Sequence, residues 1–234
     1  MKDWQGYWNE VPKQYGETEF LKQVGKTTTG ISVSNVVVNA IVSNIVEELS
    51  IGREDHILDL CCGNGLLSSN VSRQCEEVVG VDVSAVLIAV ARKYHQPENV
   101  EYFCRSILDP TLYAQLESRR ITKICVYEAL QYFRTEDLRL ILRLARKILP
   151  HDGLVLFGSI PDAEKLWSFY NTPDRQAEYF RRMAEGTEAI GTWWNKQELR
   201  EIAENEGFSV EILAQKRTLH TAHYRFDVRI RSSR

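Results

Sequence analysis

The sequence has no long apolar run and no excess of positive charge. No stretch approaches ~18 consecutive apolar residues, the length that marks a candidate membrane-spanning helix. The 29 Lys and Arg against 32 Asp and Glu leave a net charge of −3, whereas a nucleic-acid-binding domain carries a basic face or stripe. Residues 1–8 contain no apolar signal core. We therefore expect a cytoplasmic protein that binds neither membranes nor nucleic acid.

Clustered metal ligands are also missing from the sequence. The five cysteines are an odd number, and no two of them have C-x-x-C spacing. A zinc site would need Cys, His or carboxylates gathered at short spacings. Free cysteine is a frequent core residue. We expect reduced structural thiols and no metal site.

What the sequence does contain is a glycine turn between two apolar runs. Residues 57–66 read ILDLCCGNGL, in which an apolar run carrying Asp59 breaks into a small-residue turn with Gly63 and Gly65. The next apolar run ends in Asp82. Glycines let the backbone approach a ligand, and a carboxylate at the end of the second strand can accept hydrogen bonds from two ribose hydroxyls. The pattern predicts a cofactor that contains adenosine.

This stretch resembles motif I of the class I S-adenosylmethionine (SAM) methyltransferases, usually written (D/E)-x-G-x-G-x-G. Asp59 stands at the acid, and Gly63 and Gly65 stand at the last two glycines. Cys61 occupies the place of the first glycine. A dinucleotide fingerprint would instead need Gly or Ala where this chain has Ser68. The resemblance implies SAM as the cofactor and S-adenosylhomocysteine (SAH) as its product.

Short apolar runs alternate with helix-compatible segments through the middle of the chain. The runs are nearly continuous, as in parallel strands covered on both faces, and their alternation with helices favours a doubly wound α/β sheet. Strands are predicted at 56–61, 77–82, 100–104, 122–127 and 153–160. Helices are predicted at 34–49, 65–74, 84–94, 110–118 and 135–148.

The last third of the chain changes character. Residues 162–184 form an aromatic-rich helical pattern, and a predicted helix at 196–206 precedes strands at 208–216 and 221–231. Two terminal strands joined by a short loop form an antiparallel pair. Class I methyltransferases end in such a hairpin, with one of its strands inserted antiparallel into the sheet. The resemblance therefore implies a mostly parallel, seven-stranded, Rossmann-like methyltransferase fold.

Aromatic residues outside the alternating core gather in two regions, residues 1–33 and 162–195. The family builds its acceptor lid from these regions. We expect a single domain over residues 1–234, with 1–33 as an N-terminal cap and 162–195 as a lid insertion at the acceptor site. Aromatic walls suit an apolar or ring-shaped acceptor, although each aromatic could simply join the cap or lid to the domain.

Ligands of doubly wound sheets bind at the carboxyl ends of the strands. By resemblance, Asp82 accepts hydrogen bonds from the ribose and Val83 packs on adenine. Ser106 stands where the family usually has an acid for the adenine amino group. The competing candidate, Asp109, precedes Pro110 and is typical of a helix cap. The predicted cofactor-binding residues are Asp59, Cys61, Gly63, Gly65, Asp82, Val83, Ser106, Ile107, Tyr127 and Glu128.

Methyl transfer is an in-line displacement at a sulfonium carbon, so alignment of the reactants supplies much of the catalysis. A hydroxyl or amine acceptor must also lose a proton. His223 is a candidate for the base that accepts this proton, and the alternative is that it only packs against neighbouring residues. Tyr132 is a candidate residue facing the acceptor, and the alternative is that it only belongs to a surface turn. We expect metal-independent transfer to O or N of a small-molecule acceptor. The oligomeric state stays open, with a homodimer among the options.

Two other functions remain open at this point. A methyltransferase-like domain could bind SAM without turnover, because Cys61 and Ser106 depart from the family pattern. An NAD-dependent oxidoreductase is the second alternative, although the sequence lacks the third small residue of the dinucleotide fingerprint.

Overall fold

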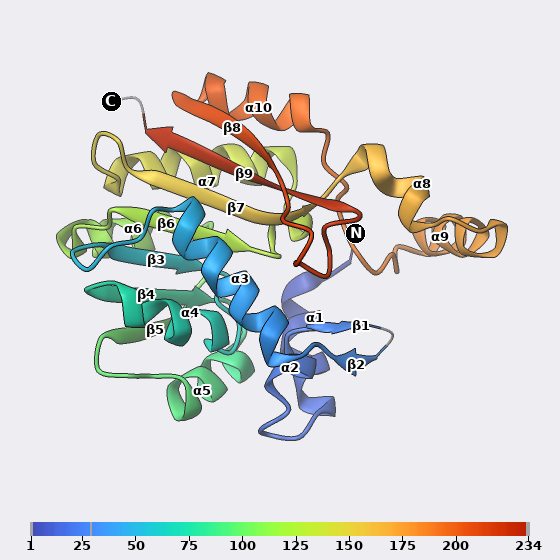
Figure 1. Ribbon diagram of the computed structural model, residues 1–234, viewed down its shortest axis with the longest axis horizontal. Helices are drawn as coiled ribbons and strands as arrows, with labels where there is room; N and C mark the ends of the chain where they lie inside the picture. The colour runs from blue at the N-terminus through green and yellow to red at the C-terminus, as the bar shows by residue number, and fades with distance from the viewer. Residues whose placement is uncertain (1, 29, 233–234) are drawn as a thin grey trace.

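The structure, a computed structural model, describes residues 2–28 and 30–232. Its centre is a seven-stranded sheet in the order β5-β4-β3-β6-β7-β9-β8 (Figure 1). Pairing is parallel from β5 to β7, whereas β9 runs antiparallel to both β7 and β8. The strands are β3 (His56–Leu60), β4 (Glu77–Asp82), β5 (Val100–Cys104), β6 (Lys123–Tyr127), β7 (Leu154–Pro161), β8 (Phe208–Ala214) and β9 (Arg225–Ser232).

Helices cover both faces of this sheet, as Figure 1 shows. The helices α3 and α4 contact each other, and α7 contacts both α6 and α10. Every residue of β7 is buried, because layers lie on both sides of it. The main helices are α3 (Asn35–Glu48), α4 (Leu66–Val71), α5 (Ala85–Tyr94), α6 (Pro110–Leu116), α7 (Thr135–Ile148), α8 (Leu166–Phe169), α9 (Pro173–Glu185) and α10 (Lys196–Asn205).

The predicted fold class is confirmed, including the antiparallel end of the sheet. The bounds of β4, β5 and α7 agree with the predictions. Two helices are shorter than predicted, because α4 and α6 each end in a 3-10 turn, at Ser72–Gln74 and Glu117–Arg119.

The predicted strand at 221–231 was placed too early. The structure begins β9 at Arg225, and residues 215–224 form a loop. Thr221 explains the difference, because its hydroxyl is buried and bonds to the side chains of Gln215 and Ser159. Its carbonyl also accepts from the backbone N–H of Tyr224, which closes a turn before the strand starts.

The N-terminal segment, residues 2–28 and 30–33, lies at the edge where the parallel strands end (Figure 1). It contains α1 (Trp4–Glu10), the 3-10 turn η1 (Val11–Gln14), α2 (Phe20–Gln23) and the short pair β1 (Thr27–Thr28) and β2 (Ile31–Ser32). The Ser84 hydroxyl donates to the carbonyl of Trp8, and the Asn64 amide donates to the carbonyl of Phe20. These bonds join the segment to the loops after β3 and β4.

In the described parts of the chain, none of the helices has the length and apolar character needed to cross a bilayer.

Candidate active site

The glycine turn after β3 has the left-handed backbone that its sequence predicts. Gly63 has φ +57° and Gly65 has φ +76°, conformations that cost glycine little. A Cβ at Gly65 would overlap the Tyr102 hydroxyl, so the turn packs tightly on β5. Cys61 has φ +62°, although it is not a glycine. The position where the family motif has its first glycine thus has a glycine-like backbone here.

Asp82 joins the end of β4 to this turn. Its carboxylate accepts from the backbone N–H of Gly63 at 2.9 Å and from that of Ser84 at 2.8 Å, one on each oxygen. Burial raises the pKa of Asp82, and the hydrogen bonds from Ser84 and Gly63 oppose this shift. Each carboxylate oxygen has a further lone pair. The side chain can therefore still accept the two hydroxyls of a ribose.

Asp59 lies within β3, one strand away from Asp82. Its carboxylate accepts from the Ser68 hydroxyl in the first turn of α4. Burial raises the pKa of Asp59 to about 7, with the Asp82 charge adding to the effect and the Ser68 hydrogen bond opposing it. Asp59 thus braces the helix that follows the glycine turn, and its assignment to the cofactor stays a prediction.

Glu128, directly after β6, forms an ion pair with a residue of the N-terminal segment. The Lys26 ammonium lies 2.5 Å from the Glu128 carboxylate and 5.5 Å from the centroid of the Tyr127 ring. Lys26 is only 4% exposed. Burial favours a protonated Glu128, but the charges of Lys26 and Arg225 outweigh burial and hold the pKa of Glu128 below its usual value. Glu128 is therefore an anion that accepts an alkylammonium group.

Strained backbone marks three neighbouring strand ends. Besides Cys61 after β3, Glu128 after β6 has φ +56° and Ser159 near the end of β7 has φ +60°. Non-glycine residues in this conformation cost roughly 1–3 kcal/mol each and cluster at active sites and ligand clamps. Because β3, β6 and β7 are adjacent in the sheet, these three residues lie along the edge that holds the glycine turn. Arg120 and Asp152, which precede β6 and β7 at the other edge, also have a positive φ, so it is the glycine turn with Asp82 that identifies the candidate site.

The predicted adenine-binding residues follow β4 and β5. Val83 is half-buried, Ile107 is buried and Ser106 is exposed. The Ser106 hydroxyl accepts from the backbone N–H of Leu108 at 3.2 Å. Asp109 caps α6 by accepting from the backbone N–H of Thr111, as its position before Pro110 indicated. The assignment of Ser106 to adenine stays a prediction.

Aromatic rings from the N-terminal segment cover the end of β6. Tyr132, in the 3-10 turn η4 (Leu130–Tyr132), lies with its ring centroid 4.5 Å from that of Trp4 and 5.6 Å from that of Trp8. A second group of rings comes from the region between β7 and α10 and from the start of β9. Its members are Phe169, Tyr170, Trp193 and Tyr224. Both predicted aromatic regions therefore meet the site edge.

The histidines divide between the two edges of the sheet. His223 is exposed and packs on the ring of Tyr224, with 4.7 Å between centroids. His220 is half-buried, and its Nδ1 is buried without a hydrogen-bond partner among the described residues. Burial lowers the pKa of His220, while the Glu128 charge opposes the shift. His95 ends α5 and contacts the Asn64 carbonyl at 2.7 Å.

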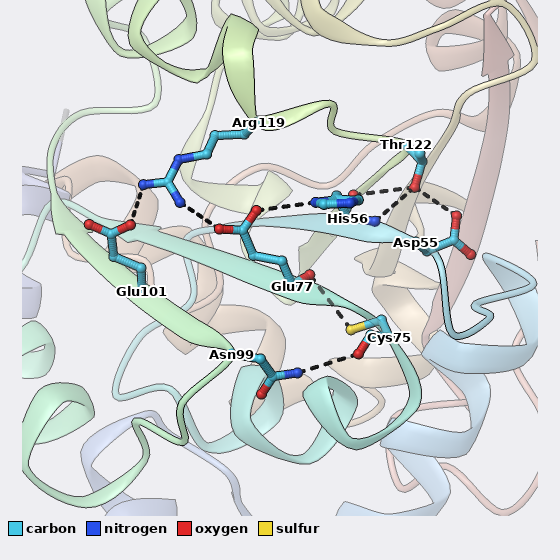
Figure 2. Close-up of polar contacts among 8 residues, drawn as sticks. All are labelled: Asp55, His56, Cys75, Glu77, Asn99, Glu101, Arg119 and Thr122. Atoms are coloured by element: carbon cyan, nitrogen blue, oxygen red, sulfur yellow. Dashed lines mark hydrogen bonds and ion pairs between the residues drawn. The ribbon is translucent and has the colours of Figure 1, made fainter.

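His56 begins β3 and lies at the opposite edge, at the amino ends of the strands. Figure 2 shows its Nδ1 facing Glu77, 3.2 Å away, and Glu77 in turn accepting from Arg119. Arg119 also pairs with Glu101 of β5. This network links the starts of β3, β4 and β5 and takes no part in the candidate site.

Three side chains at the site were not predicted from the sequence: Lys26, His220 and Arg225. Lys26 belongs to Gly25-Lys-Thr27, which is like the end of a phosphate-binding loop but lacks the first glycine that such a loop needs, so its sequence gives no sign of a role at this site. Arg225 lies on a strand whose alternating pattern indicates a polar, solvent-facing side. In the structure that side is buried, with 7% exposure at Arg225 and 1% at Asp227. The reason is that β9 lies between β7 and β8 in the sheet.

Comparison with known proteins agrees with this geometry. Residues 57–153 match the family model described as "Methyltransferase domain". The chain is 29% identical over 174 residues to a ubiquinone biosynthesis O-methyltransferase of Coxiella burnetii, covering 73% of this chain and 70% of that protein.

Two solved structures show the fold. Magnesium protoporphyrin IX methyltransferase of Synechocystis, solved with bound SAH, aligns at a TM-score of 0.62 and 14% identity over 98% of this chain and 97% of the other. A SAM-dependent methyltransferase of Clostridium acetobutylicum aligns at a TM-score of 0.64 and 12% identity, covering 89% and 96%.

The fold is that of the class I methyltransferases. Residues 57–153, which include the glycine turn and its two acids, match a methyltransferase domain.

Proposed function

We propose that this protein transfers the methyl group of SAM to an oxygen or nitrogen of a small-molecule acceptor, by in-line displacement and without a metal ion. The enclosed site edge carries the proposal. Lys26 and the rings of Trp4 and Trp8 cover the end of β6, and a covered edge favours a small acceptor over a polymer. The O-methyltransferase relative from Coxiella burnetii supports the same acceptor class.

The residues present suit SAM, whose sulfonium supplies an already activated methyl group. Asp82 has lone pairs for the ribose hydroxyls, and its bonds to Gly63 and Ser84 hold it in place. Glu128 accepts an alkylammonium, that of Lys26, in this structure. It is therefore suited to the ammonium of the cofactor's methionine. Gly63 lets the backbone approach, because it has no side chain on the ligand side.

The chain's own contribution to the chemistry is mainly alignment and exclusion of water. Well-oriented reactants gain an advantage of ~7–11 kcal/mol over free ones. The acceptor proton needs a base, and His223 and Tyr132 stay the predicted catalytic residues. We add His220 to these candidates, because burial lowers its pKa and its buried Nδ1 has no hydrogen-bond partner among the described residues.

A metal is not required by this scheme. Among residues 2–28 and 30–232, no three His, Cys, Asp or Glu side chains gather as a metal site would need. The scheme therefore predicts that chelation leaves turnover unchanged.

Label transfer tests the proposal. The purified protein would be incubated with methyl-labelled SAM and either a protein-free and RNA-free metabolite extract or purified RNA, each with and without EDTA. We expect label on O or N of extracted small molecules, equally in both EDTA arms. Label only in RNA, or loss of transfer with EDTA, would contradict the proposal.

A further inference from the structure

Arg225 is a buried cation without a carboxylate partner. It lies at the start of β9 and is 7% exposed. Within the described residues, no carboxylate oxygen lies within 4.0 Å of its guanidinium. One terminal nitrogen donates to the Ser159 carbonyl, while Nε is buried with no hydrogen-bond partner in that same part of the chain. Buried charges are normally paired, because an unpaired one loses its hydration without compensation.

The acids near Arg225 are already engaged. Glu128 pairs with Lys26. Asp227, two residues along β9, accepts from the Asn44 side chain, the Gln215 side chain and the backbone N–H of Ser159. Arg225 therefore has no acid of its own within ion-pair distance in the described chain, and it shares the charge of Glu128 with Lys26.

Arg225 lies next to the predicted cofactor residues along this edge, where its charge acts on Glu128 and Tyr127. Asp82 ends β4, the glycine turn follows β3 and Glu128 follows β6, whereas Arg225 starts β9 on the far side of β7. The row from ribose to methionine thus ends before β7. Arg225 lies one step further, where an acceptor would be placed.

The surroundings of Arg225 are aromatic. Its guanidinium lies 5.1 Å from the centroid of the Tyr224 ring, and that ring is 4.5 Å from Phe169 and 6.0 Å from Trp193 between centroids. The Tyr127 hydroxyl and the Trp193 Nε1 are also buried without partners in the described chain. Flat apolar walls with free donors suit a ring that carries acceptor atoms.

We propose that Arg225 binds a carboxylate of the acceptor, and that the acceptor is a small aromatic acid. This inference rests on the proposed transfer to a small molecule and names its class. The carboxylate would take the free Nε–H of Arg225, and the ring would lie against Tyr224 and Trp193. Arg225 is an acceptor-binding residue in this scheme and takes no part in proton transfer.

Binding of two matched probes tests the inference without any turnover. Sodium benzoate and the neutral isostere benzamide would be titrated into the SAH-saturated protein by calorimetry, at constant ionic strength. We expect benzoate to bind more tightly than benzamide. Arg225→Gln should weaken benzoate by about tenfold or more, the ratio expected from loss of a charge-assisted hydrogen bond, and should leave benzamide unchanged.

Two further variants keep the test decisive. Arg225→Lys should restore part of the benzoate affinity, because an ammonium can still donate to the Ser159 carbonyl and to the probe. Arg229→Gln removes a cation further along β9 that is already paired with Glu48 and Glu211, and benzoate binding should not change. If Arg225→Gln does not fold, the inference is still tested by comparing benzoate with benzamide on two proteins. These are the unaltered protein and Arg225→Lys.

Three outcomes would overturn the inference. The first is an equal response of the unaltered protein to both probes, including no response to either. The second is benzoate binding that survives Arg225→Gln. The third is a loss of SAH affinity in Arg225→Gln with benzoate unaffected, which would assign the guanidinium to the cofactor. The transfer reaction itself is judged separately by the labelling experiment, so the two proposals can fail independently.

Discussion

The Lys26 ammonium and the Glu128 carboxylate form a partly buried ion pair between residues 102 positions apart in the chain. It fastens the N-terminal segment to the end of β6. Since Glu128 is also the residue suited to the cofactor's ammonium, cofactor binding and closure of this segment involve the same carboxylate.

Breaking this pair should destabilise the protein. Lys26→Met leaves Glu128 buried without its partner, and we expect the free energy of unfolding in urea to fall by about 3 kcal/mol. Adding Glu128→Gln should recover part of the loss, because the unpaired charge is then removed. Lys22→Met is the matched control, since its pair with Glu19 is partly exposed, and it should change stability much less than Lys26→Met does. Strictly additive effects of Lys26→Met and Glu128→Gln would refute the coupling.

Asp82→Ala should weaken SAH binding by about 2–3 kcal/mol, because the ribose hydroxyls lose a charged acceptor. The structure adds an effect on stability: the buried N–H groups of Gly63 and Ser84 also lose their acceptor, so the melting temperature should fall. Calorimetry with SAH and a thermal melt measure the two effects separately.

Asp109→Ala is the natural comparison for Asp82→Ala. It removes a carboxylate from a helix cap and should lower the melting temperature slightly with no change in SAH affinity. A loss of SAH affinity in Asp109→Ala would assign the adenine contact to Asp109 in place of Ser106. An unchanged SAH affinity in Asp82→Ala would refute the ribose assignment.

The buried Asp59 should make stability fall as pH rises. Its pKa is about 7 in the fold, against 3.8 as the ordinary value, so between these two values the folded state binds more protons than the unfolded state. By linkage, stability decreases across that window and is then constant. Asp59→Asn removes this contribution and keeps an oxygen for the Ser68 hydroxyl.

The melting temperature of Asp59→Asn relative to the unaltered protein should therefore be higher at about pH 8 than at about pH 5. Thermal melts over this range check the sign. A difference that does not depend on pH would show that Asp59 keeps an ordinary pKa.

The pH dependence of methyl transfer can show which of the two histidines near the site, His220 or His223, is the base. This measurement follows once the labelling experiment has supplied an acceptor. A base with a lowered pKa is deprotonated at neutral pH, so His220 predicts a rate that rises with pH below about 6.5 and then levels off. His220→Asn should remove this limb and lower kcat by ~10²-fold or more. His223→Asn is the direct comparison, and the reverse result would support His223 as the base.

The short-range motif was accessible from the sequence because its chemistry is local. Asp59, Gly63 and Gly65 lie within one strand and one turn, and the backbone of the turn follows from its glycines. Asp82 ends the next strand, which pairs directly with β3. Cys61 is an example of such local agreement. Its φ is left-handed, as expected at the position of the motif's first glycine, although its side chain is not that of glycine.

The tertiary structure decided the rest of the site. Lys26 meets Glu128 only because the N-terminal segment folds back over the strand ends, and no periodicity in the sequence records that contact. Arg225 belongs to an alternating strand that resembles a solvent-facing edge, yet β9 lies between β7 and β8 and buries it. The sequence by itself indicated the cofactor, because the residues that predict it lie in one motif and at the end of the next strand. The tertiary structure determined which charges are buried together, because burial depends on where a strand lies in the sheet and not on its own pattern.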